Sequence, residues 1–88
     1  MRFAAWWYRR AIARCAAAGL DVFMLRLQET YCQAWVESEP HRRELLARHF
    51  RILCRQASDL GYVDRDGMVR LIDQLCDLEV DVRRGLAN

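Results

Sequence analysis

The sequence contains no lysine, a single proline and only four glycines among its 88 residues. So few helix-breaking residues favour α-helix along most of the chain. The sequence also lacks the run of about 18–20 apolar residues that a membrane span requires. Its apolar N-terminus begins like a signal peptide, but Arg9, Arg10 and Arg14 interrupt it. We therefore expect a cytoplasmic protein whose four cysteines are reduced thiols.

Motifs that support catalysis or cofactor binding are also missing. No glycine-rich loop precedes a helix in a phosphate-binding pattern, and no C-x-x-C pair is present to bind zinc. The segment starting at Asp64 begins like a calcium loop, but Met68 and Leu75 stand where oxygen ligands are needed. His49 falls on the apolar side of its predicted helix, which favours a core role over a catalytic one. We therefore predict no enzymatic activity, no cofactor and no metal site.

Apolar residues at helical spacing dominate the chain, and 53% of the residues are hydrophobic. Four segments follow this pattern, and we predict helices at residues 3–18, 22–37, 39–60 and 64–84. Short connections place neighbouring helices antiparallel. The predicted fold is an all-α, antiparallel helical bundle of about four helices in a single domain, residues 1–88. The break at Gly19 is weak, which leaves open one continuous rod made of the first two helices.

Capping residues predict where the helices begin and end. Ser38 precedes Pro40 and is interpreted as the N-cap of the third helix. Gly61 is placed just beyond the end of that helix, at C′. Asp64 is expected to cap the fourth helix, and Gly85 to end it.

The apolar stripes predict which side chains lie in the core. In the first helix, Trp7 and Tyr8 are expected to point inward. In the third helix the expected core side comprises Leu45, Leu46, His49, Phe50, Ile52, Leu53, Ala57 and Leu60. Each predicted helix also carries one cysteine on or beside its stripe, and we interpret all four as small buried hydrophobes: Cys15, Cys32, Cys54 and Cys76.

Three large aromatic residues follow one another in the first predicted helix, and they cannot all face one core. With the second and third directed inward, Trp6 points to the side that carries Arg2, Arg9 and Arg10. Trp and Arg are enriched among the residues that dominate binding energy at protein interfaces. We therefore predict that Trp6, Arg9 and Arg10 contact a partner. A purely core role, and a basic amphipathic helix lying on an anionic membrane, are the alternatives.

All fourteen basic residues are arginine, and their distribution is uneven. Residues 1–55 carry ten arginines and five acids, whereas residues 56–88 carry four arginines and seven acids. Such a bipolar chain suits head-to-tail association or docking on a charged partner. The third helix has a basic stripe and the fourth an acidic one: Arg48, Arg51 and Arg55, and Asp66, Asp73, Asp77 and Asp81. Either these are solvated faces, or the basic stripe binds phosphate or acidic protein, or the two stripes pair in self-association.

A corner between the last two predicted helices resembles a known group of four-helix-bundle proteins. The corner is Ala57-Ser58-Asp59-Leu60-Gly61-Tyr62-Val63-Asp64, followed by Leu71, Leu75 and Leu78. It is similar to the last hairpin of the 23S ribosomal RNA intervening-sequence proteins and of the accessory variability proteins of diversity-generating retroelements. The resemblance, over Arg48–Leu86, implies a basic, oligomeric bundle associated with nucleic acid and a reverse transcriptase. This chain is shorter than those proteins, and its last helix is acidic.

The function that we predict is non-catalytic protein–protein contact, as an adaptor, a regulator, or a phage- or plasmid-type inhibitor or immunity protein. The alternative is a nucleic-acid-associated, oligomeric four-helix bundle that works with a nucleic-acid enzyme. Membrane attachment through the first helix is a third, weaker hypothesis. The predicted contact residues are Trp6, Arg9, Arg10, Arg48, Arg51 and Arg55.

Overall fold

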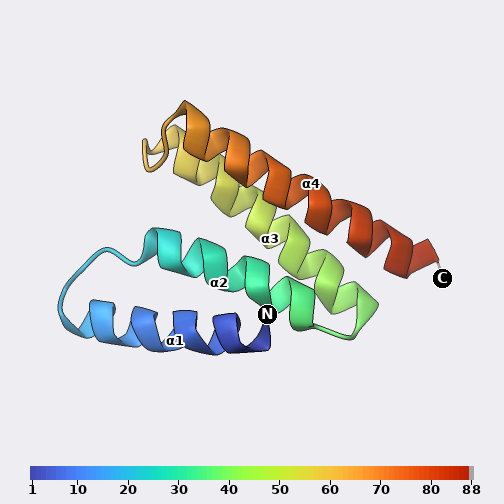
Figure 1. Ribbon diagram of the computed structural model, residues 1–88, viewed down its shortest axis with the longest axis horizontal. Coiled ribbons are helices and arrows are strands. Elements are labelled where there is room, and N and C mark those ends of the chain that lie inside the picture. Colours follow the sequence, from blue (N-terminus) through green and yellow to red (C-terminus); the bar gives the residue numbers. More distant parts are fainter. Residues whose placement is uncertain (88) are drawn as a thin grey trace.

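The computed structural model describes residues 1–87 and contains four α-helices, with no strand in that part of the chain (Figure 1). They are α1 (Arg2–Ala17), α2 (Phe23–Val36), α3 (Pro40–Asp59) and α4 (Arg65–Ala87). The all-α prediction of about four helices is confirmed. The first two helices are separate, because Gly19 adopts a φ of +75° that no continuous helix accommodates.

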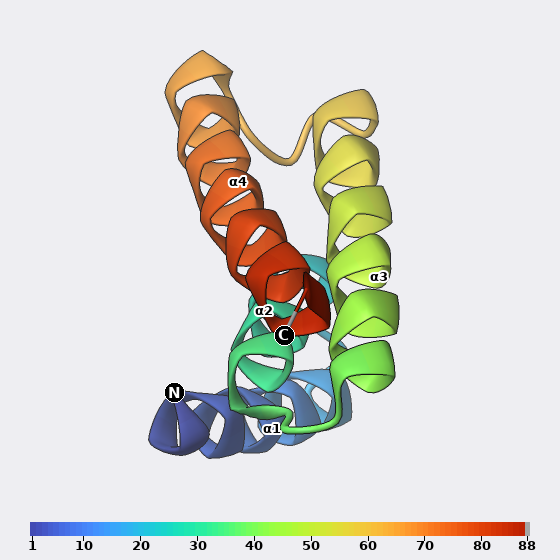
Figure 2. The ribbon, with the colours of Figure 1, turned by 90° about the vertical axis from the view of Figure 1, so that its right-hand side faces the viewer.

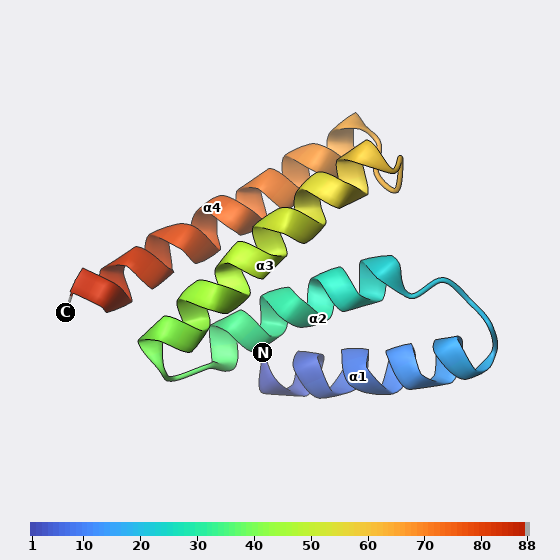
Figure 3. The ribbon, with the colours of Figure 1, turned by 180° about the vertical axis from the view of Figure 1, so that it is seen from behind.

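The helices form two antiparallel hairpins, α1–α2 and α3–α4, which meet through α2 (Figures 1 and 3). Helix α2 packs against α1 on one side and against α3 on the other, and it also touches α4. Among the described residues, α1 packs against no helix except α2. Figure 2 shows α1 beyond α2, on the side away from the α3–α4 pair. The arrangement is therefore a three-helix core with α1 added on the outside, and one whole face of α1 is left uncovered.

The core lies where α2, α3 and α4 meet. Its largest fully buried side chains are Leu27, Phe50 and Leu78, one from each of these helices. The remaining buried members of the cluster are Ala34, Ala47, Cys54, Ala57, Leu71 and Val82. Within residues 1–87, no helix combines the length and hydrophobicity needed to cross a bilayer.

The core side of α3 differs from the prediction. Ala47, Phe50, Cys54 and Ala57 are buried, at i, i+3, i+7 and i+10 spacing. Residues two positions from Phe50 or Cys54 lie about 200° around the helix, because each residue advances the helix by about 100°. Ile52, and Leu45 two positions before Ala47, are therefore exposed, although both were predicted in the core. Two other predicted core residues are also exposed: His49 lies on the flank, and Leu60 lies beyond the last residue of α3.

Two of the predicted helix ends also need correction. Glu39, not Ser38, caps α3, because its carboxylate accepts hydrogen bonds from the backbone N–H groups of His41 (3.1 Å) and Arg42 (2.8 Å). Gly85 does not end α4, which continues to Ala87. A glycine inside a helix lowers the stability of the helix by only about 1 kcal/mol relative to alanine, and the neighbouring turns can offset this loss.

The other predicted end signals function as expected. Gly61 has a φ of +75°, and the following N–H of Tyr62 donates to the carbonyl oxygen of Ala57 at 2.9 Å, which closes the end of α3. Asp64 accepts a hydrogen bond from the N–H of Gly67 at 2.8 Å at the start of α4.

Polar and aromatic contacts hold α2 against the α3–α4 hairpin. The amides of Gln28 and Gln74 exchange two hydrogen bonds, of 3.1 and 3.0 Å, between α2 and α4. The guanidinium of Arg43 donates to the carbonyl oxygen of Ala34 (2.9 Å) and to Asp81 (2.8 Å), and it lies 5.7 Å from the centre of the Trp35 ring system. Arg43 therefore joins α2, α3 and α4.

Candidate interaction surfaces

Helix α1 presents two opposite faces, and the inner one is built from small and medium side chains. Ala5 and Ile12 are buried against α2, and Tyr8 and Cys15 are half-buried on the same side. Their i, i+3, i+7 and i+10 spacing defines the stripe that faces α2. Trp7 was predicted to point inward with Tyr8, and this prediction is wrong. Trp7 lies about 100° from Tyr8 around the helix, on the flank of α1, where its ring meets that of Tyr8 edge-on and 49% of it is exposed.

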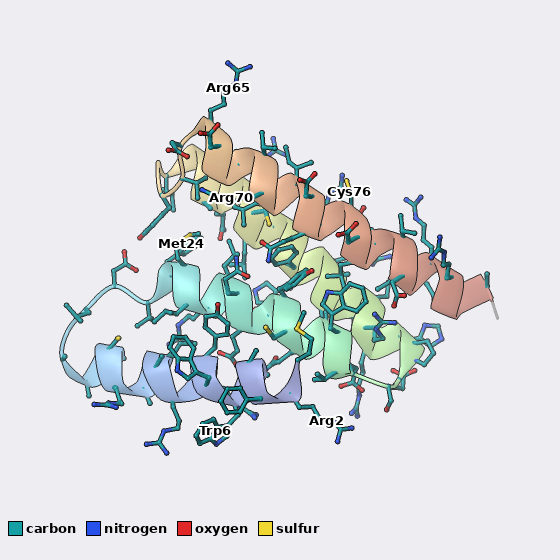
Figure 4. All side chains as sticks on the ribbon, in the orientation of Figure 1. Arg2, Trp6, Met24, Arg65, Arg70 and Cys76 are labelled. Atoms are coloured by element: carbon teal, nitrogen blue, oxygen red, sulfur yellow. The ribbon has the colours of Figure 1, made fainter. Side chains whose placement is uncertain are left out.

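The outer face of α1 is aromatic and basic. Phe3, Trp6 and Trp7 are 75%, 46% and 49% exposed. Arg10 and Arg14 continue the same side, and with Trp6 and Trp7 they line a shallow hollow. We call these five residues the aromatic–basic face. In Figure 4, Trp6 projects from α1 away from α2 and from the rest of the molecule.

Contacts within the aromatic–basic face organise it before any partner binds. The guanidinium of Arg10 lies 5.1 Å from the centre of the Trp6 ring system, within cation–π range. The rings of Phe3 and Trp6 are 5.9 Å apart, centre to centre. Helix α1 contains four arginines and no acidic residue, so no carboxylate of α1 neutralises this charge. Preorganised side chains lose less conformational entropy on binding, which favours affinity.

Only two of the predicted contact residues on α1 belong to this face. Trp6 and Arg10 lie on it. Arg9 is exposed, but it is four residues from the buried Ala5 and therefore lies toward the α2 side of the helix. Sequence reasoning missed Phe3, Trp7 and Arg14, although their spacing from Trp6 and Arg10 is present in the sequence.

The predicted arginine stripe lies on a different surface, on α3, and α1 does not contact that helix. Arg48, Arg51 and Arg55 are all exposed, as expected for a contact surface. Arg48 forms an ion pair with Glu44 at 2.8 Å, and Arg51 forms one with Glu79 at 3.0 Å. Neighbouring carboxylates thus offset two of the three charges, which weakens the attraction of this stripe for phosphates.

Helix α4 carries an exposed apolar stripe that was not predicted. Val69, Ile72, Cys76 and Val80 are all exposed, on the side opposite the buried Leu71, Leu78 and Val82. Cys76 was predicted to be buried, and this is wrong: it is two positions before Leu78, so it lies about 200° from it around the helix. The i, i+3, i+7 and i+11 spacing of this stripe is present in the sequence, but the leucine stripe of the same helix is the more prominent pattern.

The acidic residues of α4 divide between two roles. Asp81 holds Arg43, in the ion pair that joins α4 to α3. Asp66, Asp73 and Asp77 are exposed beside the apolar stripe. We call Val69, Ile72, Cys76 and Val80, with Asp73 and Asp77, the α4 outer face.

Comparison with protein-family models, with curated proteins and with solved structures finds no match to this chain.

Proposed function

We propose that this protein is a non-catalytic binding module that acts by protein–protein contact, as an adaptor, regulator or inhibitor. Its aromatic–basic face docks on an acidic protein surface. The observation that carries the proposal is the exposure of Phe3, Trp6 and Trp7 together on the one face of α1 that the fold leaves uncovered. Exposed apolar patches of this kind, bordered by charge, mark interaction sites.

The mixture of residues on this face favours a protein partner over a membrane. An interfacial membrane helix separates its aromatic side chains from its basic ones, so that the basic residues stay in water. Here Arg10 and Arg14 share the side of Trp6 and Trp7, and Arg10 lies against the Trp6 ring. Inserting this face into a bilayer would bury two guanidinium groups, at a high cost in free energy.

Nucleic-acid binding is the second candidate, and the unbalanced charge of α1 favours it. Aromatic rings and arginines together also suit the stacked bases and phosphates of a single strand. On α3, within the described residues, Arg55 forms no ion pair, whereas Arg48 and Arg51 do. We rank this candidate second because acidic side chains already hold those two guanidinium groups.

The test is an affinity pull-down from native lysate with the tagged protein, with and without nuclease, followed by binding measurements with the purified captured protein. We expect Trp6→Ala combined with Trp7→Ala to weaken that binding by at least about 30-fold, because hot-spot residues contribute about 2 kcal/mol or more. The control is Leu20→Ala with Leu60→Ala, which removes two exposed apolar side chains elsewhere.

Each arm of this experiment has a decisive outcome. Unchanged binding by the tryptophan variant would exclude the aromatic–basic face. Capture that disappears with nuclease would favour the nucleic-acid candidate. In that case Arg55→Glu and Arg10→Glu should each weaken binding, and binding should fall steeply with salt.

A further inference from the structure

The α4 outer face has the composition that the aromatic–basic face requires in a partner. It offers apolar side chains in a row, Val69, Ile72 and Val80, around the exposed thiol of Cys76. Between Val69 and Val80 the exposed charged residues are Asp73, Asp77 and Arg70, whereas Glu79 is held by Arg51 of α3. Helix α1, by contrast, carries arginines and no acid. The two faces are therefore complementary in charge, and each has large apolar side chains along part of its length.

The spacing of the two faces also matches. Phe3, Trp6, Arg10 and Arg14 follow an i, i+3, i+7 and i+11 pattern, and so do Val69, Ile72, Cys76 and Val80. Each stripe therefore extends along about 16 Å of helix. Equal lengths allow every turn of one helix to meet a turn of the other.

These faces cannot meet within one molecule. In Figure 4, Trp6 projects from the α1 edge and Cys76 from the α4 edge, in opposite directions. Figure 1 also shows that α1 and α4 run in opposite directions along the chain. A second copy stacked on the first, and turned so that the inclined helices line up, would therefore lay its α1 antiparallel on α4 of its neighbour.

We propose that the aromatic–basic face of one copy binds the α4 outer face of a second copy, so that the protein associates head to tail. This inference rests on the role proposed above for the aromatic–basic face, and it names one of that face's partners. In the antiparallel register, Phe3 meets Val80, Trp6 meets Cys76, and Arg10 lies beside Ile72 and Asp73. Because the contact joins two different surfaces, each end of a pair keeps one free face, and the assembly is open-ended.

The test uses two variants with complementary defects, studied by analytical ultracentrifugation. One carries Trp6→Glu and Trp7→Glu, and the other carries Ile72→Glu with Val80→Glu. We expect the mass of the unmodified protein to rise with concentration from 10.4 kDa to beyond two copies. Each variant alone should stay at one copy, because every contact would need the missing face. An equal mixture should form pairs and nothing larger, because each variant supplies the face that the other lacks.

The control is Leu45→Glu, which places a charge on the exposed side of α3, outside both faces, and should still assemble. Circular dichroism checks that each variant is folded. If a double variant fails to fold, the charge exchange Arg10→Glu with Asp73→Arg replaces it. Arg10→Glu alone, or Asp73→Arg alone, should weaken association by up to about 5-fold, as expected for an exposed ion pair. A protein that carries both substitutions should associate as the unmodified protein does.

Several results would overturn the inference. They are a mass that stays at one copy at all concentrations, a mixture that fails to pair, and a Leu45→Glu control that does not assemble. The pull-down described above tests the proposed function independently of self-association. A monomeric protein that still captures a partner through Trp6 and Trp7 keeps that function and loses self-association. If the protein assembles as described but captures no other protein, self-association is kept and the proposed function is lost.

Discussion

The four cysteines show how one residue type takes on different chemistry according to its place on a helix. Burial raises the pKa of the Cys54 thiol to about 11, and burial also raises the pKa of Cys32. The thiolate is the reactive form of cysteine, so both residues are chemically protected at neutral pH. Cys15 is half-buried, and Cys76 is exposed on the outer side of α4.

This difference predicts the order in which the thiols react. With a disulfide reagent at pH 8, Cys76 should be modified first, whereas Cys32 and Cys54 should react only as fast as the protein unfolds. The measurement is stopped-flow absorbance, with peptide mapping of the modified positions. In the matched control, Cys76→Ser, the fastest phase should disappear. Modification of Cys54 in that phase would contradict the burial of its thiol.

At the scale of a single element, α3 shows how a helix divides into a structural side and a free side. Phe50 is fully buried among α2, α3 and α4, whereas Ile52, two positions later, is 56% exposed. Both are large apolar side chains, and nothing in their chemistry distinguishes them. Only their direction from the helix axis decides which of them stabilises the fold.

Alanine substitutions at these two positions should therefore differ sharply. Phe50→Ala removes a large side chain from the core and should lower the free energy of unfolding by about 3–5 kcal/mol. That is a large share of the roughly 4–13 kcal/mol expected for a chain of this size. Ile52→Ala should change it by no more than about 0.5 kcal/mol. Urea denaturation measures both, and similar losses for the two variants would contradict the observed orientation of α3.

At the scale of the whole molecule, one contact joins the α1–α2 connection to the α3–α4 turn. The hydroxyl of Tyr62 donates to the carboxylate of Asp21, and the rings of Tyr62 and Phe23 stack with their centres 4.6 Å apart. The Tyr62 hydrogen bond, followed by the bond from the backbone N–H of Phe23, lowers the pKa of Asp21 below its usual 3.8. The same bond to Asp21 raises the pKa of Tyr62 above 10.0.

These two shifts predict how the contact depends on pH. A lowered carboxyl pKa stabilises the fold above the ordinary value of 3.8 and loses that effect as pH falls through the folded-state pKa. A raised tyrosine pKa stabilises the fold below 10.0 and loses that effect as pH rises through its folded-state value. Tyr62→Phe keeps the stacked ring and removes the hydrogen bond.

The difference in unfolding free energy between the unmodified protein and Tyr62→Phe should therefore be largest between these limits. It should shrink below pH 3.8 and above pH 10.0. Urea titrations at several pH values measure it. Asp21→Ala, which removes the acceptor, serves as the partner control. Near neutral pH it should lose at least as much stability as Tyr62→Phe, because it also removes the bond from the backbone N–H of Phe23. A difference that stays constant across the whole range would show that the hydrogen bond does not contribute.

Helix content, helix number and most helix ends follow from local physics, so the sequence alone was enough to predict them. Gly61 and Asp64 act through backbone conformation and short-range hydrogen bonds, which need no distant partner. Ser38 and Glu39 show the limit, because two adjacent residues can both cap a helix and only the path of the chain selects one.

For apolar side chains that could lie either in the core or on the surface, the tertiary arrangement decides which of the two they do. Trp7, Ile52 and Cys76 are apolar enough for a core, yet each is exposed because the neighbouring helix packs on the other side. A helix with two apolar stripes does not specify which one is buried. The position of α1 outside the three-helix core leaves its aromatic side uncovered. That position depends on contacts between residues distant in sequence, which no local pattern encodes.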